Sequence, residues 1–112
     1  MPNIKTAVEV VKVVHKRLQI ITPIPANRRV EMRSTEGVKF VPEFIFSEVT
    51  AFADGAVQVE HLRAYGDVGE RMLRTDYTYD WNRDEHMSWE DTPPVLLVEH
   101  AANLRARNWN EE

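Results

Sequence analysis

The sequence predicts an α+β fold in which an antiparallel sheet of four to five strands is flanked by an N-terminal and a C-terminal helix. Three features support it: an Asp-Gly turn between two strand-like runs, a helical charge spacing near the N-terminus, and a helix-start signal before residue 95. The expected element order is α-β-β-β-β-β-α. With 112 residues and 43% hydrophobic content, we expect residues 1–112 to form a single domain with its own core.

The clearest signal is a hairpin centred on Asp54-Gly55. Runs of apolar, β-branched and aromatic residues at 43–53 and 56–65 flank this dipeptide, which favours a tight two-residue turn. The first run is apolar on both faces. It is therefore expected to lie inside the sheet and not at its edge.

Residues 4–21 are predicted to form the N-terminal helix. Four charged side chains recur there at helical spacing and would form a polar stripe: Lys5, Glu9, Lys12 and Lys16. The opposite side of this helix would be apolar. The valines within 8–14 favour a strand instead, because β-branching restricts χ1. We base the helix on the charge period.

The segment from residue 22 to 42 is predicted to be a connector followed by a small hairpin. Residues 22–27 contain two prolines and cannot continue a helix. Short strands over 28–35 and 38–41 are expected on either side of a turn at Glu36-Gly37. Pro42 then marks a break before the strand of the main hairpin.

A further strand is predicted over 70–81, after a connection at 66–69. Its Met, Leu, Thr and Tyr content favours extended structure. Residues 82–91 are polar and aromatic and show no clear period.

The C-terminal helix is predicted over 95–107. Asp91 or Thr92 would be a suitable N-cap for it. Pro93 and Pro94 would fit its first turn, where a missing N–H is tolerated.

The register of the main hairpin decides which side chains are neighbours. A two-residue loop at Asp54-Gly55 places Glu48 directly opposite His61. The same ladder gives the pairs Thr50–Val59, Phe46–Arg63 and Phe44–Tyr65. If Tyr65 and Glu70 bracket the next turn, His61 also lies beside Arg74, and Arg63 beside Met72. A three-residue loop with a G1 bulge would shift the pairing by one residue and separate Glu48 from His61.

In the two-residue register one face of the sheet is the expected core. Its members are Ile45, Val49, Ala51, Leu62, Ala64, Leu73, Tyr77, Tyr79 and Trp81. The other face is also largely apolar, but four polar residues interrupt its centre. Its apolar members are Phe44, Phe46, Phe52, Val57, Val59, Tyr65 and Met72.

The four interrupting residues, Glu48, His61, Arg63 and Arg74, form the candidate catalytic site. A carboxylate beside an imidazole can fix its tautomer and raise its pKa, as an acid–base pair requires. A neighbouring arginine could hold a substrate carboxylate or phosphate. The alternative is that these residues form cross-strand charge pairs on a partly solvated sheet.

The segment 76–91 has the most unusual composition, with six acidic residues against one arginine and four large aromatic residues. Exposed Tyr and Trp are strong interface anchors, and the acids would select a basic partner. The predicted partner-binding residues are Asp80, Trp81, Asp84, Glu85 and Trp89. A more specific form of this hypothesis is that the acidic segment mimics the negative charge of a nucleic acid. The alternative is that Tyr77, Tyr79 and Trp81 belong to the core and the acids to a solvated face.

No metal site or cofactor is expected. Asp84, Glu85, His86 and Glu90 could be considered as ligands, but their spacing matches no zinc or calcium motif. The sequence also contains no Gly-rich phosphate loop, nucleophile elbow or dinucleotide fingerprint. Cysteine is absent, which excludes disulfides and thiol chemistry.

The net charge of −4 is unevenly divided. Residues 1–40 carry a balance of +5 and residues 41–112 a balance of −9. Such a split favours contacts between the two halves or between subunits. The basic residues have no interleaved aromatics, so nucleic-acid binding is not favoured. No apolar run approaches the roughly 18 residues that span a bilayer, so we expect no membrane partner. The absence of cysteine is compatible with a cytoplasmic location.

These observations together favour a non-enzymatic protein–protein interaction or regulatory module that binds itself as a homodimer and also another protein. Such a small chain is compatible with a phage or accessory protein. One alternative is a small-molecule-binding domain or enzyme that uses the candidate catalytic site. Another alternative is an inhibitor with an acidic, nucleic-acid-like surface.

Overall fold

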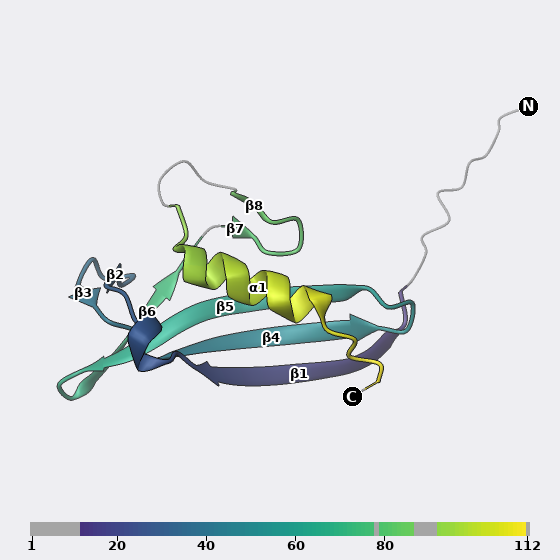
Figure 1. Ribbon diagram of the computed structural model, residues 1–112, viewed down its shortest axis with the longest axis horizontal. Coiled ribbons are helices and arrows are strands. Elements are labelled where there is room, and N and C mark those ends of the chain that lie inside the picture. Colours follow the sequence, from purple (N-terminus) through teal and green to yellow (C-terminus); the bar gives the residue numbers. More distant parts are fainter. Residues whose placement is uncertain (1–11, 78, 87–91, 112) are drawn as a thin grey trace, which may run out of the picture.

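The computed structural model describes residues 12–77, 79–86 and 92–111, and its main feature is a four-stranded antiparallel sheet with one helix across one face (Figure 1). The strand order is β1-β4-β5-β6, so β1 and β6 form the edges. These strands are β1 (Val14–Pro23), β4 (Phe44–Phe52), β5 (Val57–Val68) and β6 (Arg71–Asp76). The predicted antiparallel sheet and C-terminal helix are confirmed.

The predicted N-terminal helix is not present in the described part of the chain. Val14–Pro23 is instead an edge strand that pairs with β4 along its whole length. Side chains on β1 alternate between half-buried and exposed, as a strand requires. The helical spacing of Lys12 and Lys16 was ambiguous, because residues four apart share a face in both a helix and a strand. The β-branched content therefore decides the structure, and residues 4–11 lie outside the described part.

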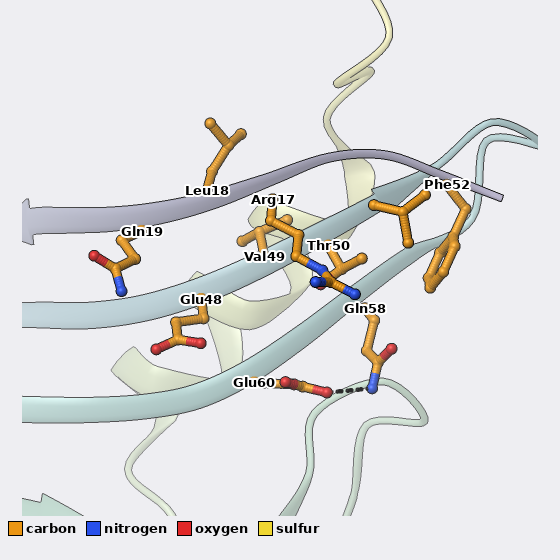
Figure 2. A pocket seen from close by; sticks show the side chains of 10 residues that line it. Arg17, Leu18, Gln19, Glu48, Val49, Thr50, Phe52, Gln58 and Glu60 are labelled. Atoms are coloured by element: carbon orange, nitrogen blue, oxygen red, sulfur yellow. Dashed lines mark hydrogen bonds between the residues drawn. The ribbon is translucent and has the colours of Figure 1, made fainter. Parts of the chain in front are cut away.

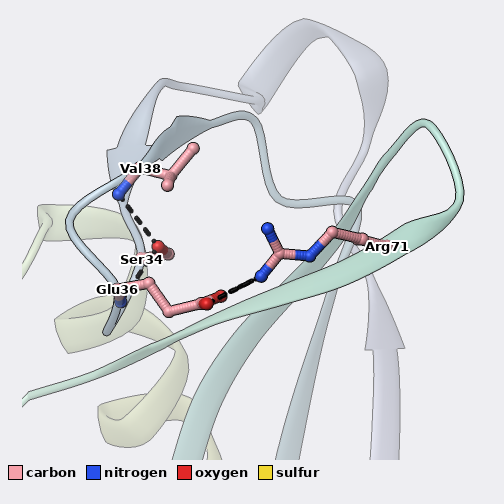
Figure 3. A network of polar contacts seen from close by, with 4 residues as sticks. All are labelled: Ser34, Glu36, Val38 and Arg71. Atoms are coloured by element: carbon pink, nitrogen blue, oxygen red, sulfur yellow. Dashed lines mark hydrogen bonds and ion pairs between the residues drawn. The ribbon is translucent and has the colours of Figure 1, made fainter.

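The connector and small hairpin follow the prediction only in part. A 3₁₀ turn (Ala26–Arg28) replaces the start of the predicted strand, and β2 (Met32–Arg33) pairs with β3 (Lys39–Phe40). The turn predicted at Glu36-Gly37 is confirmed. There the Ser34 hydroxyl accepts hydrogen bonds from the backbone N–H groups of Glu36 and Val38 at 3.2 and 3.1 Å (Figure 3).

This hairpin covers the free edge of β6. Glu36 forms an ion pair with Arg71 at 2.6 Å (Figure 3), and the Thr35 backbone N–H donates to the Arg74 carbonyl at 3.0 Å. The edge of β6 therefore has a backbone partner, which reduces its exposure to strand pairing with another chain.

The strand predicted over 70–81 is shorter than expected. β6 ends at Asp76, and Tyr79–Asp80 forms β7, which pairs with β8 (Glu85–His86) in a second small hairpin. The aromatic residues of this region still reach the core, as Trp81 is 6% exposed and packs against Tyr79 with ring centroids 4.6 Å apart.

The C-terminal helix α1 (Val95–Ala106) begins directly after Pro94, which takes the N-cap position without a side-chain cap. A cap at Thr92 is therefore wrong, and Asp91 lies outside the described residues. Pro93 and Pro94 therefore precede the helix and do not lie in its first turn. No described helix is long and apolar enough to cross a membrane.

The core lies between α1 and one face of the sheet. Leu97, Ala101 and Leu104 are buried on the helix, and burial of each leucine stabilises the fold by about 1.5–3 kcal/mol. The sheet contributes most of the predicted core face, and the buried members are Ile45, Val49, Ala51, Leu62, Ala64, Leu73 and Trp81. Beyond the helix, the Trp109 indole N–H donates to the Leu104 carbonyl at 2.8 Å, so the C-terminal segment folds back over this core.

A close backbone contact at Gly66 is one requirement of this packing. A Cβ atom at this position would lie 2.6 Å from the Val41 carbonyl oxygen and 3.0 Å from the Pro42 Cα. Gly66→Ala should therefore destabilise the fold by about 1–3 kcal/mol, as overpacking of a rigid site does. Chemical unfolding measures this change. Asp67→Ala, at the next and exposed position, should stay within about 0.5 kcal/mol of the wild type, and equal values for the two variants would contradict the packing described.

A half-buried histidine makes stability sensitive to pH. His100 on α1 lines a small cavity of about 150 Å³ with Ile45, Leu96 and Asn103, and its Nε2 atom is buried without a hydrogen-bond partner in the described structure. Burial lowers the pKa of His100 from its ordinary value of 6.5. Arg28 and Glu99 also line this cavity, but they form an ion pair with each other at 2.6 Å.

Stability should therefore fall as pH drops below 6.5. In that range the unfolded chain binds a proton at His100 before the folded chain does, so the unfolded state gains stability. His100→Gln removes this difference. Urea unfolding between about pH 7.5 and pH 5 should show a smaller loss of stability for His100→Gln than for the wild type. Parallel pH profiles for the two proteins would show that His100 contributes nothing.

Candidate functional site

The outer face of the sheet, opposite α1, carries the candidate site. No described element covers this face, since none of its side chains on β1, β4, β5 or β6 is buried. The face has two chemically different ends. We call one the aromatic end, formed by Ile21, Pro23, Phe44, Phe46 and Tyr65. The other is the polar end, formed by Arg17, Gln19, Glu48, Thr50, Gln58, Glu60 and His61, and Phe52 borders it next to the loop.

The aromatic end is an ordered apolar surface. Phe44 and Tyr65 lie opposite each other on β4 and β5, and their rings stack with centroids 5.4 Å apart and planes within 8°. Ile21 on β1 pairs with Phe46 and is 66% exposed. Stacked aromatic rings of this kind add about 0.5–1.5 kcal/mol beyond their buried area, so this end is preorganised in the free protein.

The main hairpin has a three-residue loop and not the expected two-residue loop. The Phe52 backbone N–H donates to the Ala56 carbonyl at 2.9 Å, and Gly55 has a positive φ of 93°. Glu48 is consequently opposite Glu60 and not opposite His61. The predicted Glu48–His61 strand pair is wrong, and the bulged alternative is the one that forms, because Gly55 supplies the positive φ that a three-residue loop needs.

A second irregularity at His61 restores the predicted register further along the strands. Between the Glu48–Glu60 and Phe46–Arg63 pairs, two residues of β5 lie opposite one residue of β4. His61 takes a positive φ of 49° in this bulge. The extra residue allows Val59 and Leu62 to be buried on the same face although they are three positions apart.

The bulge brings three potential ligands together. The side-chain ligand atoms of Glu48, Glu60 and His61 all lie within 4.8 Å of one another. Glu60 also accepts a hydrogen bond from the Gln58 amide, while neither glutamate forms an ion pair within the described structure. Two carboxylates and an imidazole are a ligand set for a divalent transition-metal ion.

A hollow of about 660 Å³ opens beside this cluster. Figure 2 shows Arg17, Glu48 and Glu60 on the same face of the sheet, with the Arg17 guanidinium directed toward the strand that carries Gln58. Arg17 belongs to none of the ion pairs in the described part of the chain. The hollow therefore combines one cation with two carboxylates.

The two predicted arginines are not part of this cluster. Arg63 and Arg74 instead form ion pairs with Asp76 at 2.8 and 3.4 Å. The pKa of Arg63 is raised, chiefly by a hydrogen bond with the Tyr65 side chain. Burial lowers this pKa by less, and the nearby Asp76 carboxylate raises it further. The predicted neighbours Arg74 for His61 and Met72 for Arg63 are wrong, because β5 continues to Val68 before the chain turns. Both guanidinium groups are engaged with side chains of their own face.

Glu60 is the site residue that sequence reasoning missed. The two-residue register placed it away from Glu48 and chose His61 as the partner. The spacing of the apolar residues contained the missing signal, since alternation along 57–64 breaks between Val59 and Leu62. A break of this kind indicates a bulge at the intervening residues.

The acidic segment is largely occupied by contacts within the chain. The Asp80 carboxylate accepts hydrogen bonds from the backbone N–H groups of Asn82 and Arg83 at 3.0 and 3.2 Å. Asp84 accepts a hydrogen bond from the Tyr79 hydroxyl at 3.2 Å and lies 3.8 Å from Arg105. Trp81 is in the core, as the alternative interpretation expected. Glu85 is exposed, and Trp89 lies outside the described residues.

Comparison of the chain with protein-family models, curated proteins and solved structures finds no match.

The positive φ at His61 makes the bulge sensitive to the residue type. A β-branched residue is strongly disfavoured in this conformation, whereas Asn tolerates it. His61→Val should reduce the free energy of unfolding by about 1–3 kcal/mol, and His61→Asn should change it little. Thermal or urea unfolding of the two variants measures the difference. Equal stability of both variants would mean that residue 61 does not hold this backbone conformation.

Proposed function

We propose that the chain is an interaction module that forms a homodimer, in which the outer sheet face packs against the same face of a second copy. The aromatic end is the observation that carries the proposal. Monomeric proteins rarely leave a contiguous apolar surface uncovered, and such surfaces commonly mark interaction sites. Half-buried aromatic residues at its centre are also the type that dominates interface energetics.

A two-fold axis along β4 fits the distribution of side chains. Two stacked sheets lie about 10 Å apart, so side chains of both outer faces would interdigitate. Such an axis exchanges β1 and β5 across the interface and keeps positions along the strands. Phe44 and Phe46 would then meet their own copies. Pro23 would face the partner's Tyr65, and Ile21 would face the partner's Arg63 beside it. The interface would be isologous, as in most soluble dimers.

The same axis matches opposite charges at the polar end. Arg17 on β1 shares a row with Thr50 and Gln58, and Glu60 lies two residues further along β5 than Gln58. Exchange of the two strands would therefore place Arg17 of each copy near the partner's Glu60. Complementary charges at an interface assist association and fix register, which supports a second copy as the occupant of this face.

A charge introduced at the aromatic end should disrupt the dimer. Ile21→Lys places an ammonium group within the proposed contact, opposite the partner's Arg63, and should raise the dimer Kd at least tenfold, equivalent to about 1.4 kcal/mol. Val95→Lys is the matched control, because Val95 is 70% exposed on α1 away from this face. Sedimentation equilibrium at roughly 50 µM chain should find a dimer for the wild type and the control.

Two results would overturn the proposal. One is a monomeric wild type at this concentration in both low and moderate salt. The other is a dimer whose Kd is the same in Ile21→Lys and Val95→Lys, because the interface would then lie elsewhere. Circular dichroism of each variant confirms that the comparison is made between folded proteins.

A further inference from the structure

We propose that Glu48, Glu60 and His61 bind one divalent transition-metal ion at the bulge of β5. All three ligands come from a single chain, so this site does not depend on the proposed dimer. The two glutamates project from paired positions of β4 and β5, and His61 follows Glu60 directly in the bulge.

The distances permit binding of one ion by all three side chains. Carboxylate oxygens and imidazole nitrogens bind Zn²⁺ at about 2.0–2.2 Å, so atoms on one ion lie roughly 3–4 Å apart. The three ligand atoms lie within 4.8 Å of one another. Small rotations of the side chains are therefore sufficient to close the site, without movement of the strands.

The charge of the cluster favours a cation. Glu48 and Glu60 are direct cross-strand neighbours, and like charges in this position destabilise a sheet. The cations closest along the face do not relieve this repulsion, as Arg63 is bound to Asp76 and Arg17 forms no ion pair within the described residues. A divalent ion would neutralise both carboxylates at once.

The imidazole selects the kind of ion. Mg²⁺ and Ca²⁺ prefer oxygen ligands only, whereas Zn²⁺ and its first-row neighbours accept mixed nitrogen and oxygen donors. Three protein ligands also leave at least one coordination position open toward the adjacent hollow, an arrangement typical of reactive and not of structural zinc sites.

Titration calorimetry with Zn²⁺ as the probe tests the site in the full-length chain. One Zn²⁺ per chain is expected for the wild type, with Mg²⁺ at least tenfold weaker. His61→Asn and Glu60→Gln should each weaken Zn²⁺ binding at least tenfold, because loss of even an outer-shell partner weakens metal sites by about 10–100-fold. His15→Asn, which removes an exposed imidazole from β1, should leave the affinity unchanged.

Stability provides a second readout that separates binding from a structural role. Without metal, Glu48→Gln should be as stable as the wild type or more stable, because it removes the carboxylate repulsion. With saturating Zn²⁺ the order should reverse, because only the wild type gains binding energy. The variant Ile21→Lys should still bind one Zn²⁺ per chain, because all three ligands belong to a single chain, and this stoichiometry is independent of dimer formation.

The proposal is overturned by either of two results. One is the absence of binding heat and of a thermal shift at roughly 1 mM Zn²⁺. Such a result would mean that the binding free energy is weaker than about 4 kcal/mol. The other is Zn²⁺ binding that is unchanged in both His61→Asn and Glu60→Gln, which would place the ion outside this cluster. If one of these variants does not fold, the other decides the outcome.

Discussion

The pairing of β4 with β5 is the constraint on which the rest of the structure depends. These are the two central strands, and their register contains two irregularities that compensate each other. The three-residue loop shifts the pairing by one residue, and the bulge at His61 shifts it back. A one-residue slip would turn every following side chain to the opposite face, so without the bulge either Val59 or Leu62 would leave the core. The bulge is therefore required by the core as well as by the candidate site.

The same bulge explains why polar residues collect at one end of the outer face. On the loop side of it, Glu48 is opposite Glu60; beyond it, Phe44 stacks on Tyr65. The irregular residue, His61, thus lies at the boundary between the polar and the aromatic end. A positive φ at a non-glycine residue is uncommon and often occurs at functional positions, where the surrounding structure holds it. Here the regular pairing on both sides of His61 holds the conformation.

Sequence reasoning identified the hairpin, most of the core face and, as a candidate acid–base pair, two of the three clustered side chains. It identified the core face because residues two apart on a strand share a face, which is local information. It placed Phe46 opposite Arg63 only because the two irregularities cancel. It failed for β1, since charges spaced by four residues fit a strand and a helix equally. It also failed for Arg74, because the position of the β5–β6 turn depends on Gly69, whose positive φ of 69° favours a turn later than the expected one.

The two proposals concern opposite ends of one face, and they are thermodynamically linked if both hold. An axis along β4 would bring Glu48 of one copy close to the Glu48 of the other, adding a repulsion between subunits to the repulsion within each chain. A bound divalent ion would remove both. Metal binding would then strengthen the dimer and dimer formation would strengthen metal binding by the same factor, because coupling between binding equilibria is reciprocal. The aromatic end would supply the association energy, and the carboxylates at the polar end would make that association responsive to the ion.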